Sequence, residues 1–406
     1  MSLAQQKKLE SEYLMSTFGR KPVELVRGCG MEAYDDEGKP YLDLIGGIGV
    51  LSLGHCNPQV VAALQNQSEK LMHVSNYYYI EQRGELAKTV SDLLNDQVPE
   101  AERTPWKSFF ANSGAEANEC AIKLARLFAR QNAADSAASP RIIVTLEGSF
   151  HGRTLASLAA TAQPAKQEAF QPLPGGFESV PINDVKALER LFAEKGSQIC
   201  AVMLECIQGE SGVHPCTQEF LAAARRLTEE VGALLICDEV QCGIFRTGKP
   251  FGFQQYGILP DVVTIAKGIA DGFPMGMCAA HGSAADTYQP GDHGTTFGGS
   301  CLAVAAASAT LQTICDENVA ENVNEVGAYL REKLAQLPHV TEVRGFGLML
   351  AAELDAEVDA NAIVLEALGH GLLLNATGPH TLRFLPPLIC EKRHVDALVE
   401  RLSLLL

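Results

Sequence analysis

Four short, continuously apolar runs between residues 141 and 267 constrain the fold of this chain more than any other feature. Their sequences are RIIVTLE at 141–147, ICAVMLE at 199–205, ALLICDE at 233–239 and DVVTIAK at 261–267. Residues 217–232, just before the third run, have apolar residues at helical spacing and end in a glycine. Strands that are apolar along their length and alternate with helices are typical of a parallel sheet buried on both faces. The sequence therefore predicts an α/β fold.

Each of these runs ends in a side chain that catalysis can use, and the four are Glu147, Glu205, Asp238 and Lys267. Ligands of open α/β sheets bind beyond the carboxyl ends of the strands, so we expect these side chains to converge there. Strand ends also become polar because they meet solvent, which explains any one of the four more readily than the whole set. The carboxyl edge of the sheet is therefore the predicted functional site.

The two ends of the chain have a different pattern. Residues 28–45 predict a hairpin that turns at 36–38, residues 317–337 a helix, and residues 344–354 a strand. We expect these flanks to fold together as a smaller α+β domain made of residues 1–55 and 311–406. Residues 56–310 then form the large, ligand-binding domain.

Composition limits the partners and the compartment. The chain has 406 residues and a formal charge of −17, which argues against nucleic acid or an anionic membrane as the main partner. Its 12 cysteines form no C-x-x-C pair and are irregularly spaced, as expected for reduced, mostly buried thiols of a cytosolic protein. The N-terminus has no signal-peptide pattern, and the apolar window from Cys301 is too short to span a bilayer. We therefore expect a soluble cytoplasmic protein.

Asp238 and Glu239 end the apolar run LLICDEV, which raises the alternative of a magnesium-binding aspartate in a nucleotide hydrolase. That chemistry requires a phosphate loop of the form G-x-x-x-x-G-K-[ST]. Both Gly-Lys pairs of the chain, at 38–39 and 248–249, are followed by proline. The sequence H-E-x-x-H is absent too. The nucleotide-hydrolase hypothesis is excluded, and no metal site is predicted.

A phosphate-binding turn is predicted in the sequence FFANSGAEANE, which starts at Phe109. Ser113 followed by Glu116 is a capping-box pattern. Gly114 and Ala115 then present free backbone N–H groups at the positive end of a helix dipole, where anions bind. An ordinary capped helix is the alternative when this motif is taken alone.

Lys267 decides between those two possibilities. It directly follows an apolar strand and emerges at the same sheet edge as Asp238, whereas most lysines lie on the surface. Pyridoxal phosphate needs a lysine for its aldehyde, a carboxylate for its ring nitrogen and a cradle for its phosphate. Lys267, Asp238 and the turn at 113–115 supply one each. We therefore predict a pyridoxal 5'-phosphate site with Lys267 and Asp238 as its catalytic residues.

The motifs that carry these residues resemble those of the class III, or ornithine-type, aminotransferases, nearly from end to end. They are GGIGVLSLGHCNPQVVAAL, SNYYY, FFANSGAEANE, FHGRTLASLAATA, GESGV, LLICDEVQCGIFRTG, AKGIADGFPMG, GTTFGGS, VRGFGLML and LRFLPPL. Within the class, the sequence is most similar to the acetylornithine aminotransferases. The resemblance implies fold type I, with a mostly parallel central sheet flanked by helices and a smaller α+β domain. It also implies a homodimer whose active site lies at the subunit interface.

The resemblance implies further residues around the cofactor. They are Phe150 or His151 stacked on the ring, Gln241 near the ring hydroxyl, Val240, and Thr296 reaching the phosphate of the other subunit. Three positions depart from the family pattern, namely Ala115, Cys206 and Cys301, and they leave the subfamily and its substrate open.

Two arginines are candidates for binding substrate carboxylates, because a guanidinium grips a carboxylate with two parallel hydrogen bonds. They are Arg153 in FHGRT and Arg383 in TLRFLPP. Taken singly, each is better explained as a surface or ion-paired arginine. The resemblance implies that both bind substrate and that Glu210 pairs with Arg383 while only one substrate carboxylate is bound. It also adds Thr295 to the substrate-binding residues.

The predicted reaction moves the δ-amino group of N2-acetylornithine to 2-oxoglutarate, giving N-acetylglutamate 5-semialdehyde and glutamate, as in arginine biosynthesis. Lys267 holds the cofactor and moves the proton between the substrate and cofactor carbons. Ornithine, succinylornithine, 4-aminobutyrate and a polyamine are alternative donors. The sequence also leaves open a mutase that needs no 2-oxoglutarate and a non-catalytic binding protein on the same scaffold.

Overall fold

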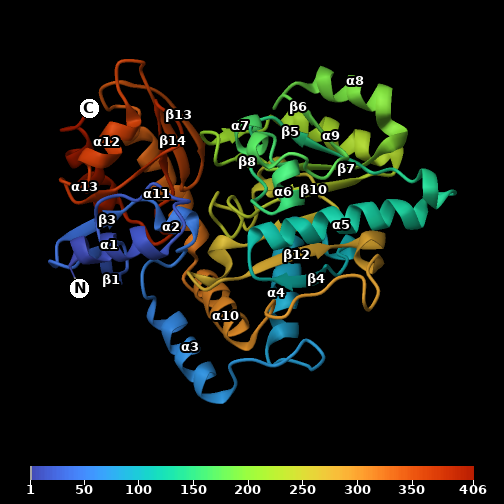
Figure 1. The fold of residues 1–406 in the computed structure, drawn as a ribbon, viewed down its shortest axis with the longest axis horizontal. Helices are drawn as coiled ribbons and strands as arrows, with labels where there is room; N and C mark the ends of the chain where they lie inside the picture. The colour runs from blue at the N-terminus through green and yellow to red at the C-terminus, as the bar shows by residue number, and fades with distance from the viewer. Residues whose placement is uncertain (1) are drawn as a thin grey trace.

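The computed structural model describes residues 2–406 and is built around a seven-stranded sheet (Figure 1). In spatial order the strands are β4 (Lys107–Ala111), β12 (Gly276–Ala280), β11 (Val262–Ile265), β10 (Leu234–Asp238), β7 (Ile199–Leu204), β5 (Ile142–Leu146) and β6 (Phe177–Val180). β12 is antiparallel to both of its neighbours, and the other strands of this sheet run in one direction. The predicted α/β fold with a mostly parallel sheet is confirmed.

The four apolar runs form β5, β7, β10 and β11, close to their predicted bounds. Every residue of β7 and β10 is buried, because helices cover both faces of the sheet. Alternate residues of β10 face opposite sides. Leu235 packs in one apolar cluster with helix α9 (Gln218–Val231), whereas Ile236 packs in another with helix α5 (Gly114–Asn132). Burial on both faces explains why these strands are apolar along their whole length.

Helices connect the strands and surround the sheet. α9 follows its cap Thr217 and ends at Gly232, which has a φ of 69°, so the helix predicted over 217–232 is confirmed. The other helices of this part are α3 (Pro58–Lys70), α4 (Arg83–Leu94), α6 (Leu155–Ala160), α7 (Pro164–Gln167), α8 (Val185–Lys195) and α10 (Cys301–Asp316). None of the helices within residues 2–406 has both the length and the apolar character that crossing a membrane requires.

The two ends of the chain meet in a second region, at the left of Figure 1. One of its sheets contains β1 (Leu25–Cys29), β2 (Glu32–Asp35), β3 (Pro40–Asp43) and β15 (Leu372–Leu373). The other contains β13 (Val340–Phe346), β14 (Met349–Leu354), β17 (Thr381–Phe384) and β16 (Asn375–Ala376). The helices are α1 (Leu3–Tyr13), α2 (Gly46–Gly49), α11 (Val319–Leu334), α12 (Ala360–Glu366) and α13 (Lys392–Leu402). β15 pairs in parallel with β3, which joins the two ends of the chain in one sheet.

The hairpin turn predicted at 36–38 and the helix predicted over 317–337 are confirmed by β2, β3 and α11. The single strand predicted over 344–354 is wrong, because the chain reverses between β13 and β14. Gly347 lies in that turn at a φ of 53°, and a Cβ there would come within 2.7 Å of the Thr247 carbonyl carbon. A glycine therefore turns the chain where the apolar pattern continues. The division into a domain of residues 56–310 and a domain formed by both ends remains a proposal.

Candidate active site

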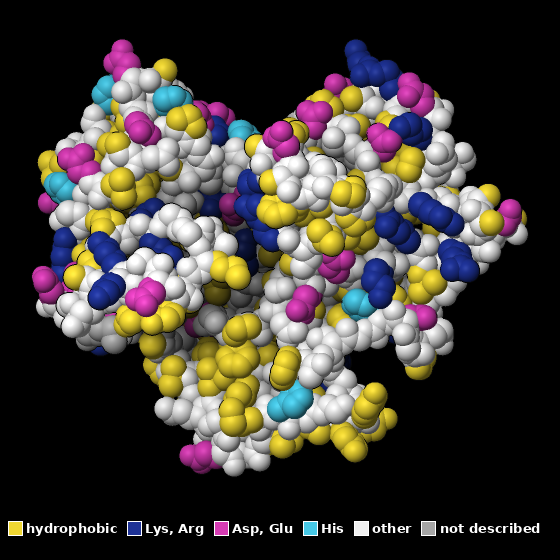
Figure 2. Space-filling model, viewed as in Figure 1, with side chains coloured by type: hydrophobic (Ala, Val, Ile, Leu, Met, Phe, Trp, Pro, Cys, Tyr) yellow, Lys and Arg dark blue, Asp and Glu magenta, His cyan; other side chains and the backbone are white. Residues whose placement is uncertain are grey.

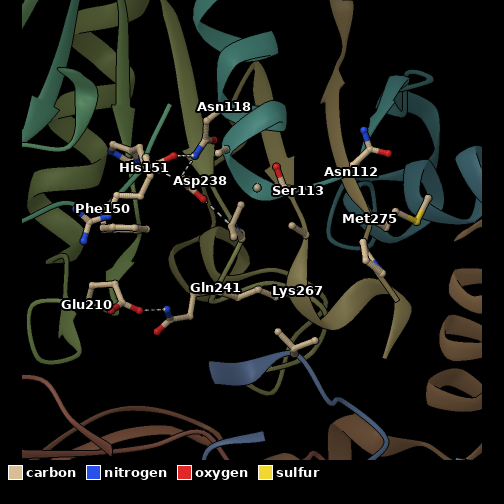
Figure 3. Close-up of a pocket in the computed structure, with 18 of the residues that line it drawn as sticks. Asn112, Ser113, Asn118, Phe150, His151, Glu210, Asp238, Gln241, Lys267 and Met275 are labelled. Atoms are coloured by element: carbon tan, nitrogen blue, oxygen red, sulfur yellow. Dashed lines mark hydrogen bonds and ion pairs between the residues drawn. The ribbon is translucent and has the colours of Figure 1, made fainter. Parts of the chain in front are cut away.

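A cavity of about 380 Å³ lies at the carboxyl edge of the large sheet (Figure 3). Eleven of the sequence-predicted site residues line it, and these are Ser113, Gly114, Ala115, Phe150, His151, Arg153, Glu210, Asp238, Val240, Gln241 and Lys267. They come from segments far apart in the sequence. The strand ends and the first turn of α5 bring them together, as expected for the ligand site of an open α/β sheet.

Asp238, the last residue of β10, is buried and held by three donors. Its Oδ2 contacts His151 Nδ1 at 2.7 Å and accepts a hydrogen bond from Asn118 Nδ2 at 2.8 Å. Its Oδ1 accepts from the backbone N–H of Val240 at 3.0 Å. Burial opposes a charge on His151, but the hydrogen bond and the charge of Asp238 outweigh it and raise the His151 pKa. The carboxylate is therefore held at a fixed position by three hydrogen-bond contacts.

His151 and Phe150 were alternative partners for the face of the cofactor ring. His151 is only 1% exposed and lies against Asp238, where its hydrogen bond fixes the imidazole. Phe150 is half-buried, and its backbone N–H donates to Glu205 Oε1 at 2.8 Å. The geometry thus gives His151 the role of orienting Asp238 and leaves Phe150 as the candidate for stacking.

Lys267 follows β11 and begins a short 3-10 helix, Lys267–Ala270, with a φ of 46°. The loop is anchored to the N-terminal segment, because Ser52 Oγ donates to the Gly268 carbonyl at 2.9 Å. The backbone N–H of Leu53 also donates to Asp271 Oδ1 at 2.8 Å. Burial is the main cause that lowers the pKa of the Lys267 amine. A lowered pKa increases the neutral fraction of the amine, which is the form that acts as nucleophile or base.

The first turn of α5 forms the predicted anion site at the cavity wall. Ser113 caps the helix by accepting from the Glu116 N–H at 3.2 Å. The reciprocal half of the predicted capping box is wrong, because Glu116 Oε2 accepts instead from the backbone N–H of Asn112 at 2.8 Å. A Cβ at position 114 would lie 2.7 Å from Val240 Cγ1, so Gly114 permits this close approach. The first N–H groups of a helix have no partner within it and favour an anion.

The other two strand-end carboxylates behave differently from one another. Glu205 is buried in the cavity wall, accepts from the Gly209 N–H at 3.2 Å, and burial raises its pKa to about 7. Glu147 is exposed and lines a separate cavity. The prediction that Glu147 lies close to Glu205, Asp238 and Lys267 is therefore wrong. β5 ends at Leu146, and the chain turns at Gly148, which has a φ of 79°. That turn directs Glu147 away from the site.

Arg383 does not line the cavity itself but forms an ion pair with Glu210, which does, with NH1 2.7 Å from Oε1. Arg383 lies on β17 and is 2% exposed. Its guanidinium also donates to Gln241 Oε1 at 3.1 Å, to the Gly209 carbonyl at 3.0 Å and to Asn375 Oδ1 at 2.8 Å. Burial opposes the Glu210 charge, but the charges of Arg383 and Lys267 outweigh it and lower the Glu210 pKa. The contact that the proposed pairing requires is therefore present.

Arg153 also lines the cavity, on the turn before α6, and its guanidinium carbon is 5.6 Å from the centroid of the Phe150 ring. Its side chain is exposed and forms no ion pair within residues 2–406. An exposed guanidinium without a partner remains free to receive a substrate carboxylate.

Thr295 and Thr296 do not line this cavity. Both line a second cavity of about 860 Å³ beside Tyr77 and Tyr79. Thr295 Oγ1 accepts from Asn112 Nδ2 at 3.2 Å, which links the two regions through a residue of the first cavity. Within a single chain, the structure therefore separates these two threonines from Lys267.

Asn118 is a site residue that the sequence analysis missed. It lies one helical turn after Gly114, so both face the same side of α5. This spacing could have predicted Asn118 as a site residue, because a polar residue four positions after a phosphate-binding glycine points into the same site.

Pyridoxal phosphate fits this arrangement. The cofactor requires a carboxylate for its ring nitrogen, and Asp238 supplies it. Lys267 supplies the amine for its aldehyde, and the N-terminus of α5 supplies the binding site for its phosphate. Two buried polar atoms beside Asp238, His151 Nε2 and Asn118 Oδ1, have no hydrogen-bond partner within residues 2–406. Buried polar atoms are normally paired, so such orphans point to a polar ligand that completes the site.

Comparisons with known proteins agree with this geometry. The family model "Aminotransferase class-III" matches residues 16–406. The acetylornithine aminotransferase of Caldanaerobacter subterraneus subsp. tengcongensis is 45% identical over 398 residues, covering 97% of each chain. That of Methanocaldococcus jannaschii is 44% identical over 399 residues, covering 97% of this chain and 96% of the relative.

Solved structures give the same result. The ornithine aminotransferase from Toxoplasma gondii ME49 superposes with a TM-score of 0.91 at 28% identity, covering 100% of this chain and 95% of the other. The acetylornithine aminotransferase from Elizabethkingia anophelis superposes with a TM-score of 0.85 at 29% identity, covering 100% and 99%. The chain belongs to the class-III aminotransferases, a family of pyridoxal-phosphate-dependent enzymes.

Proposed function

We propose that this chain transfers the δ-amino group of N2-acetylornithine to 2-oxoglutarate, giving N-acetylglutamate 5-semialdehyde and glutamate for arginine biosynthesis. The observation that carries the proposal is the meeting of Lys267, Asp238 and the N-terminus of α5 around one cavity. Relatives named acetylornithine aminotransferase, 43–45% identical over nearly the whole chain, support the choice of donor.

When bound, pyridoxal phosphate supplies an aldehyde that takes up the amino group and a protonated ring that withdraws electrons from the reacting carbon. Asp238 would keep the ring nitrogen protonated, and His151 and Asn118 hold its carboxylate in place. Lys267 would carry the proton between the reacting carbons, a task suited to an amine whose pKa burial has lowered. Phe150 would cover the ring, Gln241 would lie near its hydroxyl, and Ser113, Gly114 and Ala115 would bind the phosphate.

Arg153 binds a carboxylate in both half-reactions, and Arg383 binds the second carboxylate of 2-oxoglutarate. Glu210 neutralises Arg383 while the donor, which has one carboxylate, is bound. The 2.7 Å ion pair supports this switch, since an incoming carboxylate has to displace Glu210 to reach the guanidinium. Thr295, with its link to Asn112, belongs to the same substrate-binding set.

We further propose that two copies of the chain pair through the surface around Thr295 and Thr296, with Thr296 reaching the phosphate bound by the partner subunit. Tyr77, Tyr79 and Phe297 are exposed in this region, at 94%, 103% and 62% of their surface. Figure 2 shows hydrophobic side chains gathered at the bottom of the molecule, over the region of α3 and α10. Exposed apolar surface of this extent marks an interaction site. A cytoplasmic location remains a prediction from the sequence.

A donor panel tests the proposed substrate. Purified enzyme is supplied with 2-oxoglutarate and with acetylornithine, succinylornithine, ornithine or 4-aminobutyrate, and glutamate formation is measured. We expect a higher kcat/KM with acetylornithine than with ornithine or 4-aminobutyrate. The opposite ranking would assign the enzyme to another member of the class, and the absence of glutamate with every donor would contradict the proposed reaction.

Borohydride reduction tests the assignment of the lysine independently of the substrate. We expect the purified protein to be yellow and reduction to attach the cofactor to Lys267. Peptide mapping that finds the reduced cofactor on another lysine would overturn the assignment.

A further inference from the structure

A second cation lies near the ring of Phe150, a residue of the cavity wall that Arg153 also approaches. Lys166, on α7, places its Nζ 5.6 Å from the centroid of the Phe150 ring, the same distance as the guanidinium carbon of Arg153. The two positive groups therefore share one aromatic neighbour. Neither the resemblance to the family nor the predicted reaction assigns a role to this lysine.

The position of Lys166 is fixed by the residues on either side of it. Gln163 donates through its amide nitrogen to the Gly148 carbonyl at 3.0 Å, and its amide oxygen accepts from Lys166 Nζ. Gln167 donates to the Thr161 carbonyl at 2.7 Å. These bonds hold the short helix α7 against the end of α6, so the amine is aimed at a defined place. Such fixing lowers the entropic cost of binding a ligand.

Lys166 and Arg153 also lack a carboxylate partner in the described part of the chain. Within residues 2–406 neither forms an ion pair, although carboxylates outnumber Lys and Arg by 49 to 32. Burial and the charge of Arg153 lower the Lys166 pKa, whereas the charges of Glu210 and Glu205 oppose the change. The charge of the Lys166 amine therefore interacts electrostatically with charged residues of the cavity. Figure 2 shows Lys and Arg side chains gathered at the notch between the two parts of the molecule.

We propose that Lys166 is a specificity residue that, together with Arg153, selects donors carrying a second carboxylate on their acyl group. This inference rests on the proposed function. An N2-acylornithine has its α-carboxylate and its acylated nitrogen on the same carbon, at the opposite end from the reacting amine. When Lys267 faces that amine and Arg153 holds the α-carboxylate, the acyl group lies at the rim. A succinyl group there offers a carboxylate to Lys166, and an acetyl group does not.

The acceptor has a different requirement. 2-Oxoglutarate has two carboxylates, and the proposed function assigns them to Arg153 and Arg383. Lys166 therefore acts on the choice of donor, and its removal changes the ratio between donors more than the acceptor half-reaction. A lysine that only packs on Phe150 would change neither the ratio nor its dependence on salt.

The test measures kcat/KM of the cofactor-loaded enzyme for N2-succinylornithine and N2-acetylornithine. Lys166→Met should lower the succinyl-to-acetyl ratio about threefold to tenfold, the range expected for a charge pair at a partly exposed rim. Lys166→Arg keeps the charge and should keep most of the ratio. In the unaltered enzyme, added salt should weaken the succinyl reaction more than the acetyl reaction. Lys186→Met removes an exposed charge from α8 and serves as the matched control.

The outcomes separate this inference from the function on which it rests. An equal loss with both donors, or no loss with either, would overturn the role of Lys166. So would an unaltered enzyme that uses acetylornithine but not succinylornithine. Glutamate formation from neither donor would contradict the proposed function itself. Thermal unfolding of each variant shows whether a loss comes from the fold, and Lys166→Arg provides the comparison when Lys166→Met is unstable.

Discussion

The two candidate carboxylate-binding arginines, Arg383 and Arg153, are held in opposite ways. Arg383 is buried, lies on β17 between two other strands and is neutralised by Glu210 at 2.7 Å. Arg153 lies exposed on a turn, with Lys166 near it. A neutralised cation is available only to a ligand that can displace its partner, whereas an open cation accepts any carboxylate. We call the surroundings of Arg153 the open end of the site and those of Arg383 the buried end. The open end suits a carboxylate that all substrates share, and the buried end suits one that only some of them have.

The surroundings of Arg383 also explain how Glu210 can move away without leaving the buried guanidinium unpaired. Breaking a buried ion pair is costly when one partner is left alone. Arg383 has further neutral acceptors in Asn375, Gln241 and the Gly209 carbonyl, which remain when Glu210 moves away. Its charge is therefore hydrogen-bonded in either state. Arg153 needs no such support because its guanidinium is exposed to solvent.

A change at the centre of the cavity should have the largest effect and should not distinguish the two ends. Asp238→Asn should retain the cofactor but lower proton transfer by at least ~10²-fold, because a neutral amide cannot hold a protonated ring nitrogen. Single-turnover kinetics of both half-reactions, with cofactor content measured by absorbance, test this. Near-normal rates would show that another group protonates the ring.

Arg153→Lys should damage both half-reactions, because donor and acceptor each present a carboxylate to the open end. Lysine keeps the charge but loses the two parallel hydrogen bonds, so we expect a loss of about tenfold to a hundredfold in kcat/KM. Arg190→Lys on α8 makes the same exchange at an exposed position away from the cavity. Normal kinetics with acetylornithine would mean that Arg153 has only a structural role.

Glu210→Ala should separate the two ends, because it frees Arg383 and leaves Arg153 untouched. Binding of 2-oxoglutarate should improve and the acetylornithine half-reaction should suffer, each by about 1–3 kcal/mol. Glu210→Gln keeps the shape of the side chain without its charge and should act in the same direction. Single-turnover measurements decide the matter. If both half-reactions slow equally, or neither changes, Glu210 is only a carboxylate of the cavity wall.

The sequence predicted those parts of the fold and site that depend on local pattern. β7 and the residues of β10 before Asp238 are apolar because both faces are covered, Asp238 ends β10, and Lys267 follows two residues after the end of β11. The antiparallel direction of β12 was not predictable, since a buried strand has the same composition in either direction. The turn at Gly347 was missed because the apolar pattern continues through it.

Site residues were harder to predict where a side chain's direction depends on the turn after a strand. Glu147 resembles Glu205 in sequence, yet Glu147 points out of the cavity. His151 and Phe150 are neighbours, and only the contact with Asp238 distinguishes their roles. Arg383 and Glu210 are 173 residues apart, so no local pattern reveals their pairing, and only the family resemblance suggested it.

Asn375 provides the smallest and most selective change at the buried end. Its Oδ1 accepts from Arg383 Nε at 3.0 Å and from NH2 at 2.8 Å, on the side away from Glu210. Asn375→Ala should weaken 2-oxoglutarate binding by about 1 kcal/mol, because the guanidinium is then less well oriented for the incoming carboxylate. The donor half-reaction should change less, since Glu210 still holds Arg383 there. Asn361→Ala on α12 removes an exposed amide and is the control. A loss confined to the donor would reverse the assignment of the two ends, because it would place the donor's carboxylate at Arg383.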